Sequence, residues 1–461
     1  MTADAELCGL DAGALQVEFR AGRLSPIELL ENSLARLDET ETALNAFVAR
    51  CDERARREAR AAEARHRAGL PLGPLDGVPV SVKDLIEVEG MPCTYGSRSM
   101  LGYVSQADAP SVSRLRAAGA IVIGKTATSE FGYKGYTESP VHGVTRNPWN
   151  IALTPGGSSG GASASVAAGV TPIALGTDGG GSIRSPAALT GLVGIKAQFG
   201  RVPVWPASAT PTLAHVGPLA RSAADACAVL ATIAGPDSRD HSSLLPAMAG
   251  AASIVGLRVA FSPTLGYGRV MPEVAGQVAA AVEVLRGLWP GMTEIEAPFP
   301  DPAEILMIEF IGGCSARLAA TLATAPETID PPLRAAIENL AGRSATDYAR
   351  VVAERMEHRA RLARLFERID LLLTPTTPAP AWPLGTAVPP GFEEAAVWSY
   401  FTYPFNLTGQ PAASLPCGFT ADGLPVGLQM VVRPQAEPLL CAILTAVERA
   451  LALAPRRPQL R

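Results

Sequence analysis

The sequence predicts a layered α/β fold. Short apolar runs typical of strands alternate with helical segments, and glycine-rich loops follow several of the runs. The chain has 461 residues, of which 48% are hydrophobic, so it is long and apolar enough to bury one large core. This composition excludes a disordered chain, and a net charge of −5 argues against a protein that binds nucleic-acid phosphates.

Each element follows from its local pattern. Ser25 and Pro26 supply an N-cap and a first-turn proline for a helical region that extends to residue 68. Apolar and β-branched runs predict strands, and helical spacing of apolar residues predicts helices. In chain order we expect a strand at 78–82, a helix at 111–118, a strand at 120–123, a helix at 162–169, strands at 171–175 and 257–261, a helix at 274–288, helices within 303–367, a strand at 371–373 and an irregular stretch at 374–397.

The N-terminal residues and the cysteines indicate a cytoplasmic protein. No basic segment followed by an apolar stretch opens the chain, and no uncharged run reaches the ~18 apolar residues of a membrane span. The seven cysteines are widely spaced and never form a CxxC pair, which is typical of reduced thiols. The five histidines show no ligand spacing, so no metal site is expected.

Two lysines, Lys83 and Lys125, stand at the ends of predicted strands. The stretch from Gly119 to Thr126 matches a phosphate-binding loop pattern, but residues 120–123 between its glycines are strand-like, so we interpret it as a strand end. Lys83 closes the run of residues 78–82. Such a lysine usually reaches out to water; if it is buried instead, its pKa falls and the neutral amine becomes a base.

Two glycine-rich loops are candidates for chemistry. Residues 157–161 match a nucleophile elbow with Ser159 at its centre, which would need a histidine base, or they form a flexible linker. The small-residue helix that follows favours a loop whose free N–H groups bind an anion or an oxyanion. Residues 176–184 place three glycines before Ser182, which suits either converging N–H groups or a tight turn without chemistry.

Taken together, Lys83, Ser158 and Ser182 resemble the amidase signature family, whose members use a Ser-cisSer-Lys arrangement. The resemblance covers nearly the whole chain. It extends over residues 73–84, 124–132, 146–149, 155–201, 216–221, 405–411 and 423–429. The chain departs from the family at residues 194–198, which read GIKAQ where many members read GLKPT.

The resemblance implies a fold and a set of roles. The fold would be an α/β/α sandwich around a large mixed twisted sheet with peripheral N-terminal helices. Ser182 would be the nucleophile, and Ser158, after a cis peptide bond, would relay protons to a neutral Lys83. The backbone N–H groups of Gly179, Gly180, Gly181 and Ser182 would form the oxyanion hole. No metal and no organic cofactor would be needed.

The resemblance also implies a single domain over residues 1–461. Within it, residues 1–70 would form the N-terminal helical region and residues 71–235 the catalytic core. Residues 236–461 would complete the sheet and supply the variable pocket segments and a C-terminal helix. The expected partners are a small amide or carbamate substrate and water, with no nucleic acid and no membrane; a homodimer is common in the family.

The substrate pocket is expected in segments that vary within the family. Their candidate residues are Tyr133, Tyr136, Phe310, Trp398, Tyr400 and Tyr403, although many of these side chains are equally plausible as core. Because they are apolar or aromatic, they favour an uncharged, hydrophobic or aryl amide over one that carries a carboxylate. The chain resembles stand-alone bacterial amidases, similar to aryl-acylamidases and urethanases, and esterase side activity is expected.

The sequence leaves three alternative functions open. The chain could be the glutaminase component of a tRNA-dependent amidotransferase, which shares the signature and requires a partner. It could be a catalytically silent scaffold, which the presence of Lys83, Ser158 and Ser182 argues against. It could also be an elbow hydrolase, in which case replacing Ser159 would be fatal rather than mild.

Overall fold

The computed structural model describes residues 3–250, 252–394, 397–453 and 456–460. Its centre is an eleven-stranded mixed sheet in the order β1-β3-β2-β6-β8-β7-β12-β13-β11-β9-β10. The strands, in that order, are Phe47–Arg50, Ile121–Thr126, Pro79–Lys83, Ile173–Asp178, His215–Ala220, Val193–Lys196, Ala412–Phe419, Pro425–Val432, Leu371–Pro375, Val259–Phe261 and Thr293–Glu294. A separate two-stranded ribbon pairs β4 (Glu138–Ser139) with β5 (Gly143–Val144).

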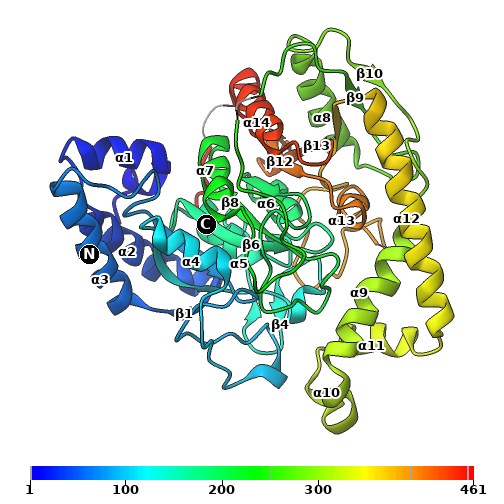
Figure 1. Ribbon diagram of the computed structural model, residues 1–461, viewed down its shortest axis with the longest axis horizontal. Helices are drawn as coiled ribbons and strands as arrows, with labels where there is room; N and C mark the ends of the chain where they lie inside the picture. The colour runs from blue at the N-terminus through cyan, green and yellow to red at the C-terminus, as the bar shows by residue number, and fades with distance from the viewer. Residues whose placement is uncertain (1–2, 251, 395–396, 454–455, 461) are drawn as a thin grey trace.

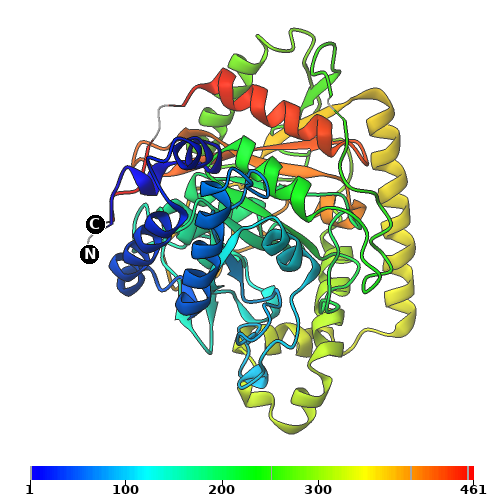
Figure 2. The ribbon, with the colours of Figure 1, turned by 60° about the vertical axis from the view of Figure 1, so that its left-hand side comes forward.

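Fourteen helices surround the sheet in the described part of the chain. They are α1 (Ala12–Arg20), α2 (Pro26–Leu44), α3 (Asp52–Arg67), α4 (Pro110–Ala117), α5 (Gly160–Ala167), α6 (Arg184–Thr190), α7 (Ala223–Ile233), α8 (Pro272–Leu285), α9 (Ala303–Arg317), α10 (Ala319–Thr324), α11 (Pro331–Leu340), α12 (Ala345–Arg368), α13 (Pro404–Thr408) and α14 (Glu437–Leu451). Figures 1 and 2 show α1–α3 at one side of the molecule and α12 along the opposite side.

Strand directions divide the sheet into regions. Strands β3, β2 and β6 are parallel, so their carboxyl ends share one edge. From β6 through β8, β7, β12, β13 and β11 every neighbouring pair is antiparallel. Loops that follow parallel strands gather at the same edge of the sheet, which brings the residues after β2 and β6 together.

The two faces of the sheet are covered differently. Helices α7, α8 and α14 pack on one face against a large aliphatic cluster that includes Val80, Leu175 and Leu371. Helices α5 and α6 cover the other face with small side chains such as Ala162 and Ala187. Small residues let α5 and α6 approach the sheet closely, and their N-terminal ends lie beside the loops that carry Ser158 and Ser182.

The predicted elements are largely present, with one correction in the N-terminal region. The sequence predicts helix throughout residues 26–68, but β1 (Phe47–Arg50) separates α2 from α3 and pairs antiparallel with β3. Asn45 ends α2 in the left-handed conformation at φ 51°, which turns the chain toward the sheet. The N-terminal region therefore contributes an edge strand as well as peripheral helices.

Among the residues that the structure describes, no helix combines the length and the apolar character that crossing a membrane requires.

Candidate active site

Strand β2 determines where Lys83 points. Side chains alternate between the two faces of a strand, and Val80 and Val82 belong to the large aliphatic cluster on one face. Ser81 and Lys83 therefore face α5, and the Ser81 hydroxyl lies 3.3 Å from that of Ser165 on this helix. Lys83 is fully buried at the carboxyl end of the strand.

Three hydroxyl groups surround the Lys83 amine. Its Nζ lies 2.7 Å from Ser158 Oγ, 2.9 Å from Ser159 Oγ and 2.8 Å from Thr177 Oγ1. Burial lowers the pKa of Lys83 well below its ordinary value, and the negative charge of Asp178 offsets this only in part. Burial therefore favours the neutral amine, which has two N–H donors and one lone pair.

The hydrogen bonds of Ser159 define the direction of one of these contacts. Its hydroxyl donates to the Thr177 carbonyl at 3.1 Å, so it must accept from the Lys83 amine. One N–H of the amine is used in this way. The lone pair remains available to the other hydroxyls, so the amine is able to take up the proton of Ser158.

The peptide bond between Gly157 and Ser158 is cis, as the resemblance implies. Only glycine fits at position 157, because a Cβ there would lie within 2.5–2.7 Å of the Tyr136 backbone. The loop thus lies tightly against the Tyr136 backbone just before α5 begins at Gly160. This arrangement orients Ser158, which is almost fully buried, toward Lys83.

A buried ion pair shapes the loop that carries Ser182. Asp178, the last residue of β6, accepts from the Gly181 N–H at 2.7 Å and from Arg184 Nε at 2.9 Å. Burial alone would raise the pKa of Asp178, but the Arg184 guanidinium outweighs it and holds the pKa below its ordinary value. Arg184 also donates to the Thr402 carbonyl, to Asn406 and to Gln429, at 2.9, 2.6 and 2.8 Å.

We call the ion pair of Asp178 and Arg184 the Asp178–Arg184 clamp. It corrects the expectation that the Gly181 N–H belongs to the oxyanion hole. Because the Gly181 N–H donates to Asp178, it is not free to bind an oxyanion. In the described structure the N–H groups of Gly179, Gly180 and Ser182 have no such acceptor. Gly181 serves the turn instead: its φ is +134°, and a Cβ there would lie 2.2 Å from Thr402 Oγ1.

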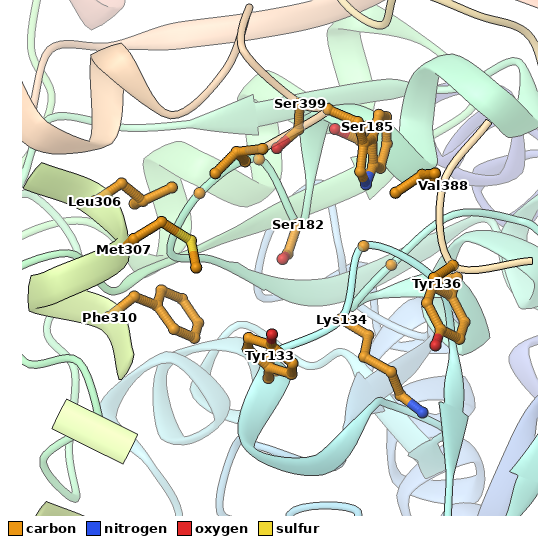
Figure 3. Close-up of a pocket in the computed structure, with 18 of the residues that line it drawn as sticks. Tyr133, Lys134, Tyr136, Ser182, Ser185, Leu306, Met307, Phe310, Val388 and Ser399 are labelled. Atoms are coloured by element: carbon orange, nitrogen blue, oxygen red, sulfur yellow. The ribbon is translucent and has the colours of Figure 1, made fainter. Parts of the chain in front are cut away.

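A cavity of about 240 Å³ opens at Ser182. In Figure 3 the Ser182 side chain points into it, with Leu306, Met307 and Phe310 from α9 on one side and Tyr136 on the other. Tyr133 lies beside Phe310, with the ring centres 6.5 Å apart. Trp398, Val388 and Ser399 also line this cavity, which we call the first cavity. Most of the lining is apolar, so it suits a hydrophobic or aromatic group.

Four of the six candidate pocket residues line the first cavity, namely Tyr133, Tyr136, Phe310 and Trp398. Tyr400 and Tyr403 are placed elsewhere. Both are buried in a core cluster, where the phenol of Tyr403 donates to Asp301 and that of Tyr400 donates to the Arg269 carbonyl. Their hydroxyls are therefore bound within the protein and do not face the first cavity.

Lys134, in the wall of the first cavity, forms an ion pair with Asp330. Lys134 Nζ lies 2.7 Å from Asp330 at the start of α11 and 4.9 Å from the centre of the Tyr136 ring. In Figure 3 its amine points away from Ser182. This cation therefore fastens the segment before α11 to the pocket loop rather than facing the nucleophile.

The other motifs from the sequence do not form sites of their own. Residues 121–126 are strand β3, and Lys125 forms a buried ion pair with Asp84 at 3.0 Å, so there is no phosphate loop. Within the described chain the Ser159 side chain bonds Lys83 and the Thr177 backbone, and no histidine contacts it. No cluster of three or more potential metal ligands occurs among the described residues.

Comparison with known proteins identifies the family of this chain. The Amidase family profile matches residues 28–441. The chain belongs to the amidase signature family. Its α/β/α fold around a mixed sheet, expected from the resemblance, is confirmed.

Two relatives and one solved structure show the range of this amidase family. One subunit of the glutamyl-tRNA(Gln) amidotransferase from Symbiobacterium thermophilum is 38% identical, with 98% of this chain and 99% of that protein covered. An acylamidase from Rhodococcus erythropolis is 35% identical, with 97% of each chain covered. The structure of a bacterial aryl acylamidase superposes with a TM-score of 0.87 at 28% identity, over 97% of this chain and 99% of that chain.

Replacing Lys83 by Met tests whether the lysine is neutral when the protein is folded. In the interval between the lowered pKa and the ordinary one, the unfolded chain binds a proton that the folded protein does not, so wild-type stability rises with pH there. Relative to Lys83→Met, the unfolding free energy of the wild type should increase by about 1.4 kcal/mol per pH unit. Urea denaturation at pH 7, 8 and 9 measures this. A difference that does not change with pH would mean that folded Lys83 keeps its proton.

Replacing Ser159 by Ala separates a positioning role from a nucleophilic one. The change removes one of three hydroxyls around Lys83, at a cost of about 1 kcal/mol, so kcat/KM for an amide should fall only about fivefold. Thr177→Val, which removes another of the three, is the matched control and should behave similarly. A Ser159→Ala enzyme as inactive as Ser182→Ala would favour the elbow mechanism.

Proposed function

We propose that this protein hydrolyses uncharged amides with an apolar or aromatic acyl group, through an acyl-enzyme on Ser182. The observation that carries the proposal is the buried Lys83 amine, 2.7 Å from Ser158 Oγ, beside a half-buried Ser182 that opens onto an apolar cavity. A neutral lysine replaces the histidine base of other serine hydrolases.

The reaction follows from the positions of these groups. Ser182 Oγ attacks the amide carbonyl carbon, and its proton passes to Ser158, whose own proton passes to Lys83 Nζ. The negative charge that develops on the carbonyl oxygen is stabilised by the N–H groups of Gly179, Gly180 and Ser182. The relay then returns a proton to the nitrogen, the C–N bond breaks, and the amine departs.

Water completes the turnover along the same path. It loses a proton to Ser158 and Lys83 as it attacks the ester carbonyl of the acyl-enzyme, and Ser182 regains its proton when the acid leaves. The same attack applies to carbamates and esters, whose carbonyl carbons accept Ser182 in the same way. An alkoxide or phenoxide leaves more readily than an amine, which supports an esterase side activity.

A second candidate is the glutaminase component of an amidotransferase, favoured by the 38% identity to one subunit of such an enzyme. Glutamine carries a carboxylate and an ammonium group beside its amide. The described lining of the first cavity is mainly apolar, and its lysine, Lys134, is paired with Asp330. These features favour an uncharged substrate.

A silent scaffold is disfavoured by the intact contacts among Lys83, Ser158 and Ser159.

A panel of four substrates tests the proposal. We expect release of amine from 3-phenylpropanamide, its 4-nitroanilide or the matching 4-nitrophenyl carbamate, and a loss of at least a thousandfold in Ser182→Ala. Release of ammonia is the readout for the primary amide and for glutamine, the fourth substrate. Turnover of glutamine alone would favour the amidotransferase component, and equal activity in wild type and Ser182→Ala would contradict the proposed nucleophile.

A further inference from the structure

A second, smaller cavity meets the first one at Ser182. It has a volume of about 60 Å³, against about 240 Å³ for the first cavity. Gly132, Ser182 and Phe310 line both. The walls that belong to the second cavity alone include the loop of residues 203–210, which we call the 203–210 loop.

The proton relay opens onto the second cavity. Ser158 and Thr177, two of the three hydroxyl groups around Lys83, line the second cavity and not the first. The first cavity instead borders Gly180 and Gly181 in the Ser182 loop and Gly157 before the cis bond. The two cavities therefore approach the reacting carbonyl from different sides, and the relay serves one side only.

The mechanism assigns one part of the substrate to each side. We call the acyl group and the amine the two arms of the substrate. Ser158 must give a proton to the departing nitrogen and later take one from the attacking water, so both lie within its reach. The nitrogen and the water therefore belong in the second cavity, and the acyl group occupies the first. This assignment rests on the proposed function, because it uses Ser158 as the proton donor.

The volumes then set the size of each arm. A cavity of ~150 Å³ holds a benzene ring, and a water molecule occupies ~30 Å³. The first cavity therefore has room for a phenyl group with a short linker, whereas the second is too small for an aromatic ring. We infer that this enzyme prefers primary or N-methyl amides of bulky apolar acids over anilides, whose aromatic ring is on the nitrogen.

The walls of the second cavity resist widening. The 203–210 loop lies against α9, where a Cβ on Gly313 would come within 2.2 Å of the Ala209 carbonyl. The loop is also fastened at Val204, whose N–H donates to Asp240 at 2.8 Å, and the Arg239 guanidinium lies 4.9 Å from the centre of the Trp205 ring. The loop and α9 would have to move together to admit a ring.

Two series of amides test the inference with the full-length enzyme. One keeps the 3-phenylpropanoyl group and changes the nitrogen from NH₂ to NHCH₃ to anilide. The other keeps NH₂ and lengthens the acyl group from acetyl to butanoyl to 3-phenylpropanoyl. We expect kcat/KM to rise along the acyl series by about fourfold per methylene and to fall at least a hundredfold from the primary amide to the anilide. Aniline is a better leaving group than ammonia, so only the site explains that fall.

Two variants identify the cavities. Trp205→Ala widens only the second cavity and should raise the anilide-to-primary-amide ratio of kcat/KM at least tenfold. Its matched control, Met307→Ala, widens only the first cavity and should shift the preferred acyl length while this ratio stays the same.

The outcomes distinguish the inference from the proposed function. Anilide turnover as fast as primary-amide turnover in the wild type would overturn the assignment of arms while leaving the acyl-enzyme mechanism intact. A change of acyl preference in Trp205→Ala, with the nitrogen preference unchanged, would reverse the assignment. Silence toward every amide in both series would overturn the proposed function and the inference with it.

Discussion

The buried amine of Lys83 is the constraint on which the active site depends. Its three side-chain contacts in the described structure are hydroxyls, and Asp178, the acid whose charge acts on it, is bound by Arg184. A charged lysine without a counter-ion in contact would be costly there, so burial favours the neutral amine. Strand alternation in β2 and the small residues of α5 create this position, because together they bring a lysine and two serines into one buried space.

A second polar centre keeps the Ser182 loop in shape. Asp178 and Arg184 connect β6 and α6 to the carbonyl of Thr402, to Asn406 and to Gln429, residues more than two hundred positions later in the chain. The C-terminal part of the chain therefore helps to hold the Ser182 loop in shape. Removing one partner of a fully buried pair costs ~3–5 kcal/mol, so the clamp also holds the two halves of the sheet together.

Some of the site residues and strands could be predicted from the sequence, and others could not. Lys83 stood out because a charge ended an apolar run, and Ser182 because three glycines followed a strand. Strands β12 and β13 were missed, since both are buried on their two faces and carry proline or glycine, so neither shows alternation. The expectation that the Gly181 N–H binds the oxyanion was wrong, because this N–H donates to Asp178, a contact that depends on how the loop turns. Tyr400 and Tyr403 share the aromatic character of the pocket residues, and only their tertiary contacts separate core from lining.

The most direct test of the account is the position of the acyl group during turnover. The enzyme is mixed with the methyl ester of 3-phenylpropanoic acid, quenched in acid within milliseconds and digested for peptide mass spectrometry. We predict an acyl group on Ser182 in the wild type, which is lost in Ser182→Ala. An acyl group on Ser159, or turnover without any acylated peptide, would contradict it.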